Sequence, residues 1–221
     1  MLKRLFDFVA ALAALLLLAP LLLVIALAIK LAMPGPVFYS GERVGLGGRI
    51  FRMHKFRSMV VGADQLGGSC VSEGDPRVTR FGRFLRKSKL DELPQLFNVL
   101  AGDMSLVGPR PEVEEYVRTY TAEERVILAV RPGITDWASI WDRDEAAVLA
   151  GASDPERAYR ELVLPEKKRL QLLYVRERSF CRDLSILCTT LQVLLLRPPL
   201  RPPAADAKRG ESGTKPILHD C

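Results

Sequence analysis

An uncharged apolar stretch close to the first residue constrains the fold of this chain more than any other feature. Residues 8–29 are 22 residues long, consist almost entirely of Leu, Ala, Val and Ile, and include no charged side chain. A helix of this length crosses a hydrocarbon core of about 30 Å. Three interpretations are open: a cleaved signal peptide, a helix that spans the membrane, and a helix that enters and leaves on one side.

Two details argue against simple spanning. Pro20 lies in the middle of the stretch, where proline removes a backbone hydrogen bond and bends a helix. Basic residues flank both ends, Lys3 and Arg4 before the stretch and Lys30 after it. Because positive charge favours the cytoplasmic side, this pattern can place both ends in the cytoplasm. Proline is also tolerated in spanning helices, so composition alone leaves the topology open.

The remaining residues predict a mainly helical α+β domain. Two short apolar segments, residues 37–39 and 50–53, flank a glycine-rich turn at 45–48. This pattern indicates a β-hairpin more than a phosphate-binding loop, because no βαβ pattern follows it. Helical patterns cover 112–130 and 154–176.

An apolar stripe of helical spacing runs from residue 180 to residue 196. It is typical of core packing and equally of a helix lying in the membrane interface, so both interpretations stay open. Residues 198–221 are rich in proline and charge, which predicts a disordered tail.

The charge balance restricts the class of partner only loosely. Lys and Arg number 32 against 26 Asp and Glu, a net charge of +6. This excess favours acidic partners such as phosphates, nucleic acid or anionic lipids, without choosing among them. The four cysteines have no CxxC spacing, which predicts reduced thiols.

Two adjacent carboxylates, Asp91 and Glu92, are the strongest candidates for chemistry. Pro94 follows them, and proline favours the first turn of a helix, so we expect the pair at a helix start with Ser88 or Asp91 as the cap. The helix dipole and neighbouring arginines would keep both groups ionised. An ionised Asp is a competent nucleophile at phosphorus and a neighbouring Glu can hold Mg²⁺. Acidic capping of a helix explains the same residues without chemistry.

Basic residues surround this pair in the sequence. Arginines recur every third residue from 77 to 86, which places much of their charge on one helix face. Lys55 and Arg57 alternate with aromatic and apolar residues, which indicates either an exposed strand edge or the cationic wall of a phosphate site. Arg110 lies between two prolines that restrict the backbone, so its guanidinium is carried on a stiff segment suited to binding a phosphate.

Together these residues resemble the bacterial sugar transferases, the small monotopic phosphoglycosyl transferases that act on polyprenyl phosphate. The resemblance extends over about residues 1–196 and rests on five motifs in order: Lys55-Phe56-Arg57-Ser58-Met59, Leu90-Asp91-Glu92-Leu93-Pro94-Gln95, Gly102-Asp103-Met104-Ser105, Pro109-Arg110-Pro111 and Arg131-Pro132-Gly133-Ile134-Thr135. It implies a re-entrant anchor over residues 1–32, broken at Pro20. It also implies a catalytic domain over residues 33–197, with interfacial helices, on the cytoplasmic face of the bacterial inner membrane.

The resemblance also implies a reaction and its residues. Asp91 would attack the β-phosphate of a nucleoside-diphosphate sugar, expected to be a UDP-sugar, and displace the nucleoside monophosphate. Polyprenyl (undecaprenyl) phosphate would then take the phosphosugar, the first membrane step of glycoconjugate assembly. Glu92 would bind Mg²⁺, Arg110 and Arg86 would bind phosphate, and Lys55 and Arg57 would line the same pocket.

Two departures from the family pattern bear on these expectations. The family often has serine before the helix-breaking proline, where this chain has Ala19. Residues 136–145 replace the commoner Gly-Leu-Ala-Gln pattern, so the identity of the sugar stays open.

A membrane-tethered basic protein that binds nucleic acid or anionic lipid without catalysis is the alternative. The combination of motifs favours the enzyme, with membrane lipid but no nucleic acid among its partners.

Overall fold

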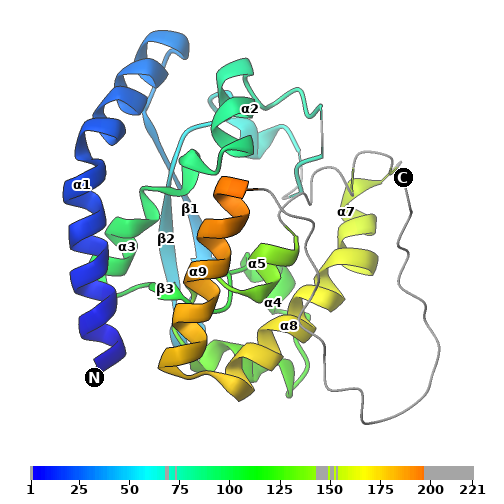
Figure 1. Cartoon of the computed structure of the whole chain (residues 1–221). Coiled ribbons are helices and arrows are strands. Elements are labelled where there is room, and N and C mark those ends of the chain that lie inside the picture. Colours follow the sequence, from blue (N-terminus) through cyan, green and yellow to red (C-terminus); the bar gives the residue numbers. More distant parts are fainter. Residues whose placement is uncertain are drawn as a thin grey trace.

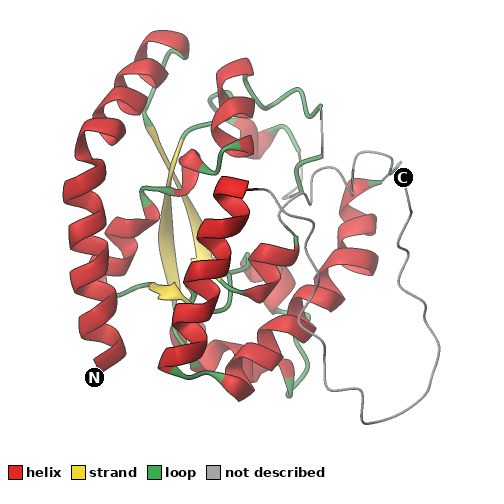
Figure 2. Cartoon of the chain, viewed as in Figure 1, coloured by secondary structure: helices red, strands yellow, loops and turns green. Residues whose placement is uncertain are grey.

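The computed structural model describes residues 2–67, 70–72, 74–142, 149, 152 and 154–196, so the predicted tail at 198–221 lies outside it. Helices predominate and the strands are short, as the sequence predicts (Figure 1, Figure 2). The helices are α1 (Leu2–Ala32), α2 (Arg80–Lys87), α3 (Gln95–Ala101), α4 (Glu114–Val117), α5 (Trp137–Trp141), α7 (Pro155–Ala158), α8 (Leu164–Glu177) and α9 (Phe180–Leu196). The strands are β1 (Phe38–Val44), β2 (Ile50–Phe56), β3 (Ser105–Val107) and β4 (Gly133–Thr135).

The strands form two separate pairs. β1 and β2 are antiparallel, with Phe38 opposite Phe56 and Val44 opposite Ile50, which confirms the predicted hairpin. β3 and β4 are parallel, a pairing that the sequence analysis did not predict. Immediately after β3 the backbone at Gly108 comes very close to the start of β4. A Cβ atom on Gly133 would lie 2.1 Å from the amide nitrogen of Gly108. This contact places residues 108–110 beside β4.

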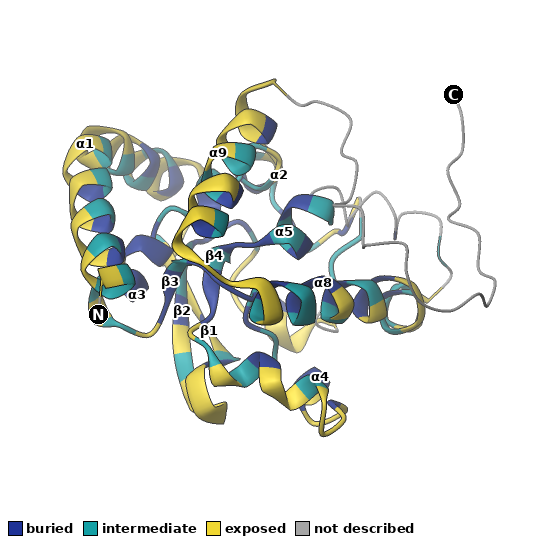
Figure 3. Cartoon of the chain, turned by 60° about the horizontal axis from the view of Figure 1, so that its bottom comes forward, coloured by how far each residue is buried: buried dark blue, intermediate teal, exposed yellow. Residues whose placement is uncertain are grey.

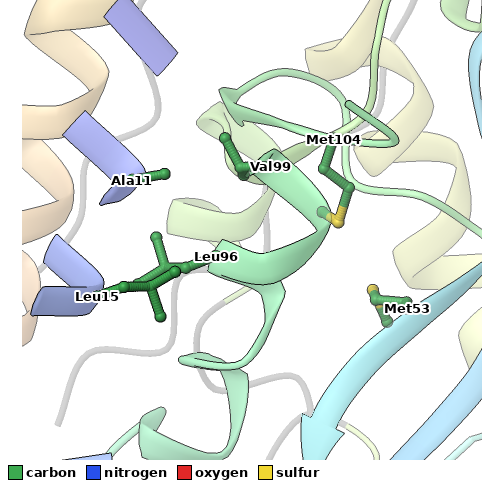
Figure 4. Close-up of a cluster of buried hydrophobic side chains, with 6 residues drawn as sticks. All are labelled: Ala11, Leu15, Met53, Leu96, Val99 and Met104. Atoms are coloured by element: carbon green, nitrogen blue, oxygen red, sulfur yellow. The ribbon is translucent and has the colours of Figure 1, made fainter. Parts of the chain in front are cut away.

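Helix α1 packs along the domain through one narrow stripe. Its buried residues are Asp7, Ala11, Leu15, Ile25 and Ile29. Figure 4 shows the first of two contact regions, where α1 side chains meet α3 and two methionines; the cluster is Ala11, Leu15, Met53, Leu96, Val99 and Met104. Many of the remaining α1 residues are apolar and exposed, among them Leu16, Leu17, Leu23 and Leu31.

Pro20 does not interrupt α1. The helix runs from Leu2 to Ala32 with Pro20 inside it. Its ribbon nevertheless changes direction along its length (Figure 1, Figure 3). Because proline has no amide hydrogen and its ring crowds the preceding turn, Pro20 accounts for a bend within a continuous helix.

Polar contacts hold the first turns of α1 against the domain. The guanidinium of Arg4 donates to the carbonyl of Val99 at 2.5 Å, in the last turn of α3. The carboxylate of Asp7 is buried and accepts from the hydroxyl of Ser105 at 2.7 Å, at the start of β3. A buried carboxylate is costly unless it is hydrogen-bonded, so these contacts fix the N-terminal end of α1 to this surface.

The other end of α1 is held by Arg57. Its buried guanidinium donates to the carbonyl oxygens of Met33 at 2.6 Å and Pro34 at 2.8 Å. These carbonyls lie at the C-terminal end of the helix, where no intrahelical donor is left for them. Arg57 therefore caps α1, and both ends of the helix are attached to one domain.

The helical predictions for the second half of the chain succeed unevenly. The segment 112–130 forms only the short α4 and a 3₁₀ segment, Glu124–Ala129. The segment 154–176 is helical as predicted, with a π-helical turn, Tyr159–Val163, between α7 and α8. Pro165 lies in the first turn of α8, where a missing amide hydrogen costs least.

The stripe at 180–196 is helix α9, and it serves core and surface together. Ile186 and Val193 are buried in the core, whereas Leu191 and Leu195 are exposed. Exposed apolar residues thus line the outer sides of both α1 and α9 (Figure 3).

Candidate active site

A sharp turn between α2 and α3 carries the carboxylate pair. The hydroxyl of Ser88 donates to the carbonyl of Phe84, so Ser88 ends α2 instead of capping the next helix. Lys89 follows with φ 57°, the only non-glycine residue with positive φ in the described part of the chain. A left-handed lysine is strained, and such strain occurs where the fold forces a particular direction.

Asp91 and Glu92 occupy the single 3₁₀ turn Leu90–Glu92, which precedes α3. The sequence predicted that they would lie in the first turn of a longer helix, and this prediction is wrong. The turn gives the two neighbouring side chains different surroundings.

Glu92 lies between two cations. The guanidinium of Arg110 donates to both of its carboxylate oxygens, with Nη1 3.0 Å from Oε2 and Nη2 on Oε1. The ammonium of Lys55 reaches the same Oε1 at 3.3 Å. All three side chains are at most 20% exposed. Arg110 uses the two-pronged geometry with which guanidinium groups bind carboxylates and phosphates.

The charges of this cluster shift one another's pKa values. Burial alone would raise the pKa of Glu92, but Arg110, Lys55 and Lys89 hold it well below its usual value. Burial lowers the pKa of Lys55, and the Glu92 charge opposes that shift. The pKa of Arg110 is raised, because Glu92 outweighs the effect of burial. Glu92 is therefore ionised and neutralised by its partners.

Asp91 has the opposite environment. Its side chain is 4% exposed, and its Oδ1 atom is buried without a hydrogen-bond partner. Burial raises its pKa, although Lys55 and Arg86 act in the other direction. This shift is opposite to the expectation that helix dipole and arginines would lower it, because burial outweighs them. A more basic carboxylate with an unpaired oxygen is suited to nucleophilic attack, and neighbouring acids with divergent pKa values have divergent roles.

The predicted phosphate-binding residues divide into two groups. Lys55 and Arg110 contact Glu92 directly, and the charge of Arg86 acts on Asp91. Arg57 does not share these contacts, because its guanidinium donates to the carbonyls of Met33 and Pro34 at the end of α1.

The arginines at positions 77, 80, 83 and 86 also divide into two groups. Arg77 precedes α2 and forms an ion pair with Asp75 at 2.7 Å, whereas Arg86 lies in the last turn of α2. The four arginines therefore do not share one helix.

Lys89 belongs to the site although the sequence analysis did not assign it a role. Its charge lowers the pKa of both Asp91 and Glu92. A basic residue two positions before Asp91 was the available signal, and the left-handed backbone at Lys89 is not readable from residue type.

A cavity of about 300 Å³ opens beside Glu92, between α1 and α9. Its charged lining residues are Lys89, Glu92, Arg110 and Asp142. Most other lining residues are apolar and come from α1, α3, β3, β4, α5 and α9; they include Leu18, Leu93, Leu96, Leu106, Ile134, Ile140, Leu187 and Val193. Such a cavity suits a ligand with a phosphate at one end of an apolar chain.

Glu92 meets the requirements of a magnesium site only together with a substrate. Within the described ranges, no three His, Cys, Asp or Glu side chains are grouped closely enough to hold a metal. Mg²⁺ is commonly bound by one or two carboxylates together with substrate phosphates and waters. The oxygens of Glu92 fit that pattern if Arg110 transfers from Glu92 to a phosphate, which leaves Oδ1 of Asp91 for attack.

The family model described as bacterial sugar transferase matches residues 1–197. An Aeromonas hydrophila UDP-N-acetylgalactosamine-undecaprenyl-phosphate N-acetylgalactosaminephosphotransferase is 49% identical over 141 residues, 62% of this chain and 33% of the relative. A UDP-glucose:undecaprenyl-phosphate glucose-1-phosphate transferase of Xanthomonas campestris pv. campestris is 42% identical, over 85% of this chain and 37% of the relative. A protein of the same name from Caulobacter vibrioides is 41% identical, over 87% of this chain and 69% of the relative. The chain thus spans about a third of the first two relatives.

Proposed function

This chain belongs to the bacterial sugar transferase family, and we propose that it transfers a phosphosugar from a UDP-sugar to a polyprenyl phosphate, as the first membrane step of glycoconjugate assembly. The observation that carries the proposal is the pairing of a buried Asp91, whose Oδ1 has no hydrogen-bond partner among the described residues, with a Glu92 held by two cations. The names of the relatives supply the donor and acceptor classes.

The residues support a two-step transfer. The Asp91 carboxylate attacks the phosphorus that carries the sugar, a P–O bond to Asp91 forms, and the P–O bond to the nucleoside monophosphate breaks. An oxygen of polyprenyl phosphate then attacks the same phosphorus, the bond to Asp91 breaks, and the carboxylate is restored. Arg110, Lys55 and Arg86 neutralise the phosphates and orient them.

We propose Mg²⁺ as the cofactor, held by Glu92 with the diphosphate. When bound, it would neutralise phosphate charge and so favour departure of the leaving nucleotide.

The cavity between α1 and α9 supports a polyprenyl acceptor. Its apolar walls offer few hydrogen bonds to a sugar or a base, but they match an isoprenoid chain, while Arg110 and Lys89 at its charged end match the phosphate.

The attachment of both ends of α1 to one domain supports a re-entrant anchor. Arg4 and Asp7 hold the first turns, and Arg57 holds the last carbonyls. Since a folded domain lies on one side of a bilayer, its two attachment points lie there too, although α1 is long and apolar enough to cross. We place the domain at the cytoplasmic face of the inner membrane, with the exposed leucines of α1 and α9 in the lipid.

Cysteine labelling tests this topology. In a background without the four native cysteines, Leu2→Cys at the start of α1 and Arg49→Cys in the hairpin turn introduce one exposed thiol each. We expect a membrane-impermeant maleimide to label both only after the inner membrane is permeabilised. Labelling of Leu2→Cys but not Arg49→Cys in intact spheroplasts would establish a spanning helix.

Release of nucleoside monophosphate tests the reaction. Purified protein, Mg²⁺ and undecaprenyl phosphate are incubated in turn with UDP-glucose, UDP-N-acetylgalactosamine and other nucleotide sugars. We expect UMP from at least one donor, and chelation of the metal should reduce its release by about a hundredfold or more. No release from any donor, together with tight salt-sensitive binding of nucleic acid, would favour the non-catalytic alternative.

A further inference from the structure

The main chain around Arg110 is held by side chains as well as by backbone hydrogen bonds. We refer to residues 107–112 as the Arg110 segment. Prolines at positions 109 and 111 have no amide hydrogen, so only four of these six residues have a backbone N–H. Backbone hydrogen bonds hold its two sides: Gly108 donates to the carbonyl of Thr135 at 3.1 Å, and the carbonyls of Pro109 and Glu112 each accept at 3.0 Å from Gly133 and Val44. Arg110 lies between these points, and it carries the guanidinium that faces Glu92.

Both main-chain groups of Arg110 bind buried side chains from other elements. Its N–H donates to Oδ2 of Asp136 at 3.1 Å. Its carbonyl accepts from Nε2 of Gln171 at 3.1 Å. Asp136 is 0% exposed and Gln171 is 1% exposed. Buried polar groups are costly unless paired, so this pairing fixes both peptide planes next to Arg110.

Helix α8 contributes further contacts from the same face. Lys167, Gln171 and Tyr174 are four and three residues apart, which places them on one side of the helix. The ammonium of Lys167 binds Glu112 at 2.9 Å. The hydroxyl of Tyr174 lies 3.2 Å from the carbonyl oxygen of Val107 and 2.8 Å from Oδ1 of Asp183, and its single hydrogen is shared between these two acceptors. A buried stripe that served core packing alone would be apolar. Here each polar side chain meets one point along the Arg110 segment.

Asp136 joins this support to α5. Its Oδ1 accepts from the amide and the hydroxyl of Ser139, both at 2.6 Å, and so caps that helix. The same carboxylate thus holds the start of α5 and the backbone of Arg110. Asp136 is also the first residue of the segment that departs from the commoner family pattern.

We propose that Asp136 and Gln171 are positioning residues for the transfer reaction, which act by holding the backbone of Arg110 so that its guanidinium faces Glu92 and the phosphates of the donor. The inference rests on the proposed function for its kinetic consequence. Its structural content, a restrained Arg110 segment, can be measured without any turnover.

Two near-isosteric variants remove one contact each. In Asp136→Asn the amide oxygen still accepts from Ser139, while the amide NH₂ replaces Oδ2 opposite the N–H of Arg110. Gln171→Met keeps the volume and removes the donor to the carbonyl. Leu170→Val, a buried neighbour of Gln171 on α8, is the matched control for loss of packing.

Hydrogen exchange gives the first readout. Peptides that cover residues 107–112 report the four amides of the segment in the membrane-bound protein. We expect both variants to accelerate exchange there by about tenfold or more, whereas Leu170→Val at similar stability does not. Unchanged exchange in both variants would overturn the proposal, whether or not the protein turns over any nucleotide sugar.

Coupling to Arg110 gives the second readout. With the donor that releases most UMP, each variant should lower kcat/KM about ten- to a hundredfold, because small displacements of a binding group are costly. In an Arg110→Lys background the same variants should cost only about twofold, while Leu170→Val should cost the same in both backgrounds. Equal losses in both backgrounds would assign Asp136 and Gln171 to general stability alone. If the wild type releases no UMP, the proposed function fails, and hydrogen exchange alone decides the positioning role.

Discussion

Replacing Asp91 with asparagine is expected to abolish transfer while the protein stays folded. The amide has nearly the same shape but is not a nucleophile at phosphorus, so UMP release should fall by about a thousandfold or more. The side chain is buried and one of its oxygens has no partner, so little packing is lost and the thermal midpoint should be preserved. UMP release and thermal unfolding, measured on the same preparation, separate these effects.

Two controls sharpen this result. Asp91→Glu keeps the charge and displaces the nucleophile by one methylene, so a residual activity between those of wild type and Asp91→Asn is expected. Glu114→Gln changes an exposed carboxylate whose partner is Arg118, and its activity should stay within about twofold of wild type. Near-native turnover of Asp91→Asn would exclude Asp91 as the nucleophile.

Replacing Arg110 with alanine is expected to reduce both activity and stability. Glu92 would keep Lys55 but lose its two-pronged partner, and its pKa would rise towards the usual value because burial would be less well compensated. The loss of one partner of a buried pair costs about 3–5 kcal/mol of unfolding free energy, and the remaining cations reduce this here to about 2–3 kcal/mol. The value of kcat/KM should fall by about a hundredfold or more, since a phosphate contact is lost too.

Arg110→Lys separates the two effects. It keeps a positive charge near Glu92 and removes the guanidinium fork, so most of the stability should return while kcat/KM stays at least about tenfold low. Arg118→Ala removes an exposed arginine that pairs with Glu114, and it should change the free energy of unfolding by no more than about 0.5 kcal/mol. If Arg110→Lys had wild-type kcat/KM, Arg110 would contribute charge alone, without directional binding.

Local pattern was sufficient to predict several elements. The alternation around the glycine-rich turn predicted the hairpin, and the leucine spacing predicted α9. The pair Asp91–Glu92 and the proline-flanked Arg110 were recognised from residue type and order, and the structure brings them together at Glu92.

Burial decided what the sequence could not show. The pKa of Asp91 moves upward because the surrounding fold removes water, which no local pattern records. Arg57 resembles a phosphate-binding residue in sequence, yet the carbonyls at the end of α1 take its donors. Gln171 and Tyr174 look like ordinary polar positions of a surface helix, and only tertiary packing turns them towards the Arg110 segment.

The strands β3 and β4 could not be predicted from sequence patterns either. Each has three residues, too few for an alternating pattern to be distinguished from a loop. Their parallel pairing depends on the close approach of Gly108 and Gly133, which are 25 positions apart in the chain.

The most direct test of the account is the mass of the enzyme during the first half-reaction. The protein is mixed with Mg²⁺ and its UDP-sugar donor without polyprenyl phosphate, quenched with acid, and analysed intact and as peptides. We predict an added mass of one phosphosugar, located on the peptide that contains Asp91, absent in Asp91→Asn, and lost when undecaprenyl phosphate is added before the quench. Release of UMP only when the acceptor is present, with Asp91 unmodified throughout, would contradict the covalent mechanism.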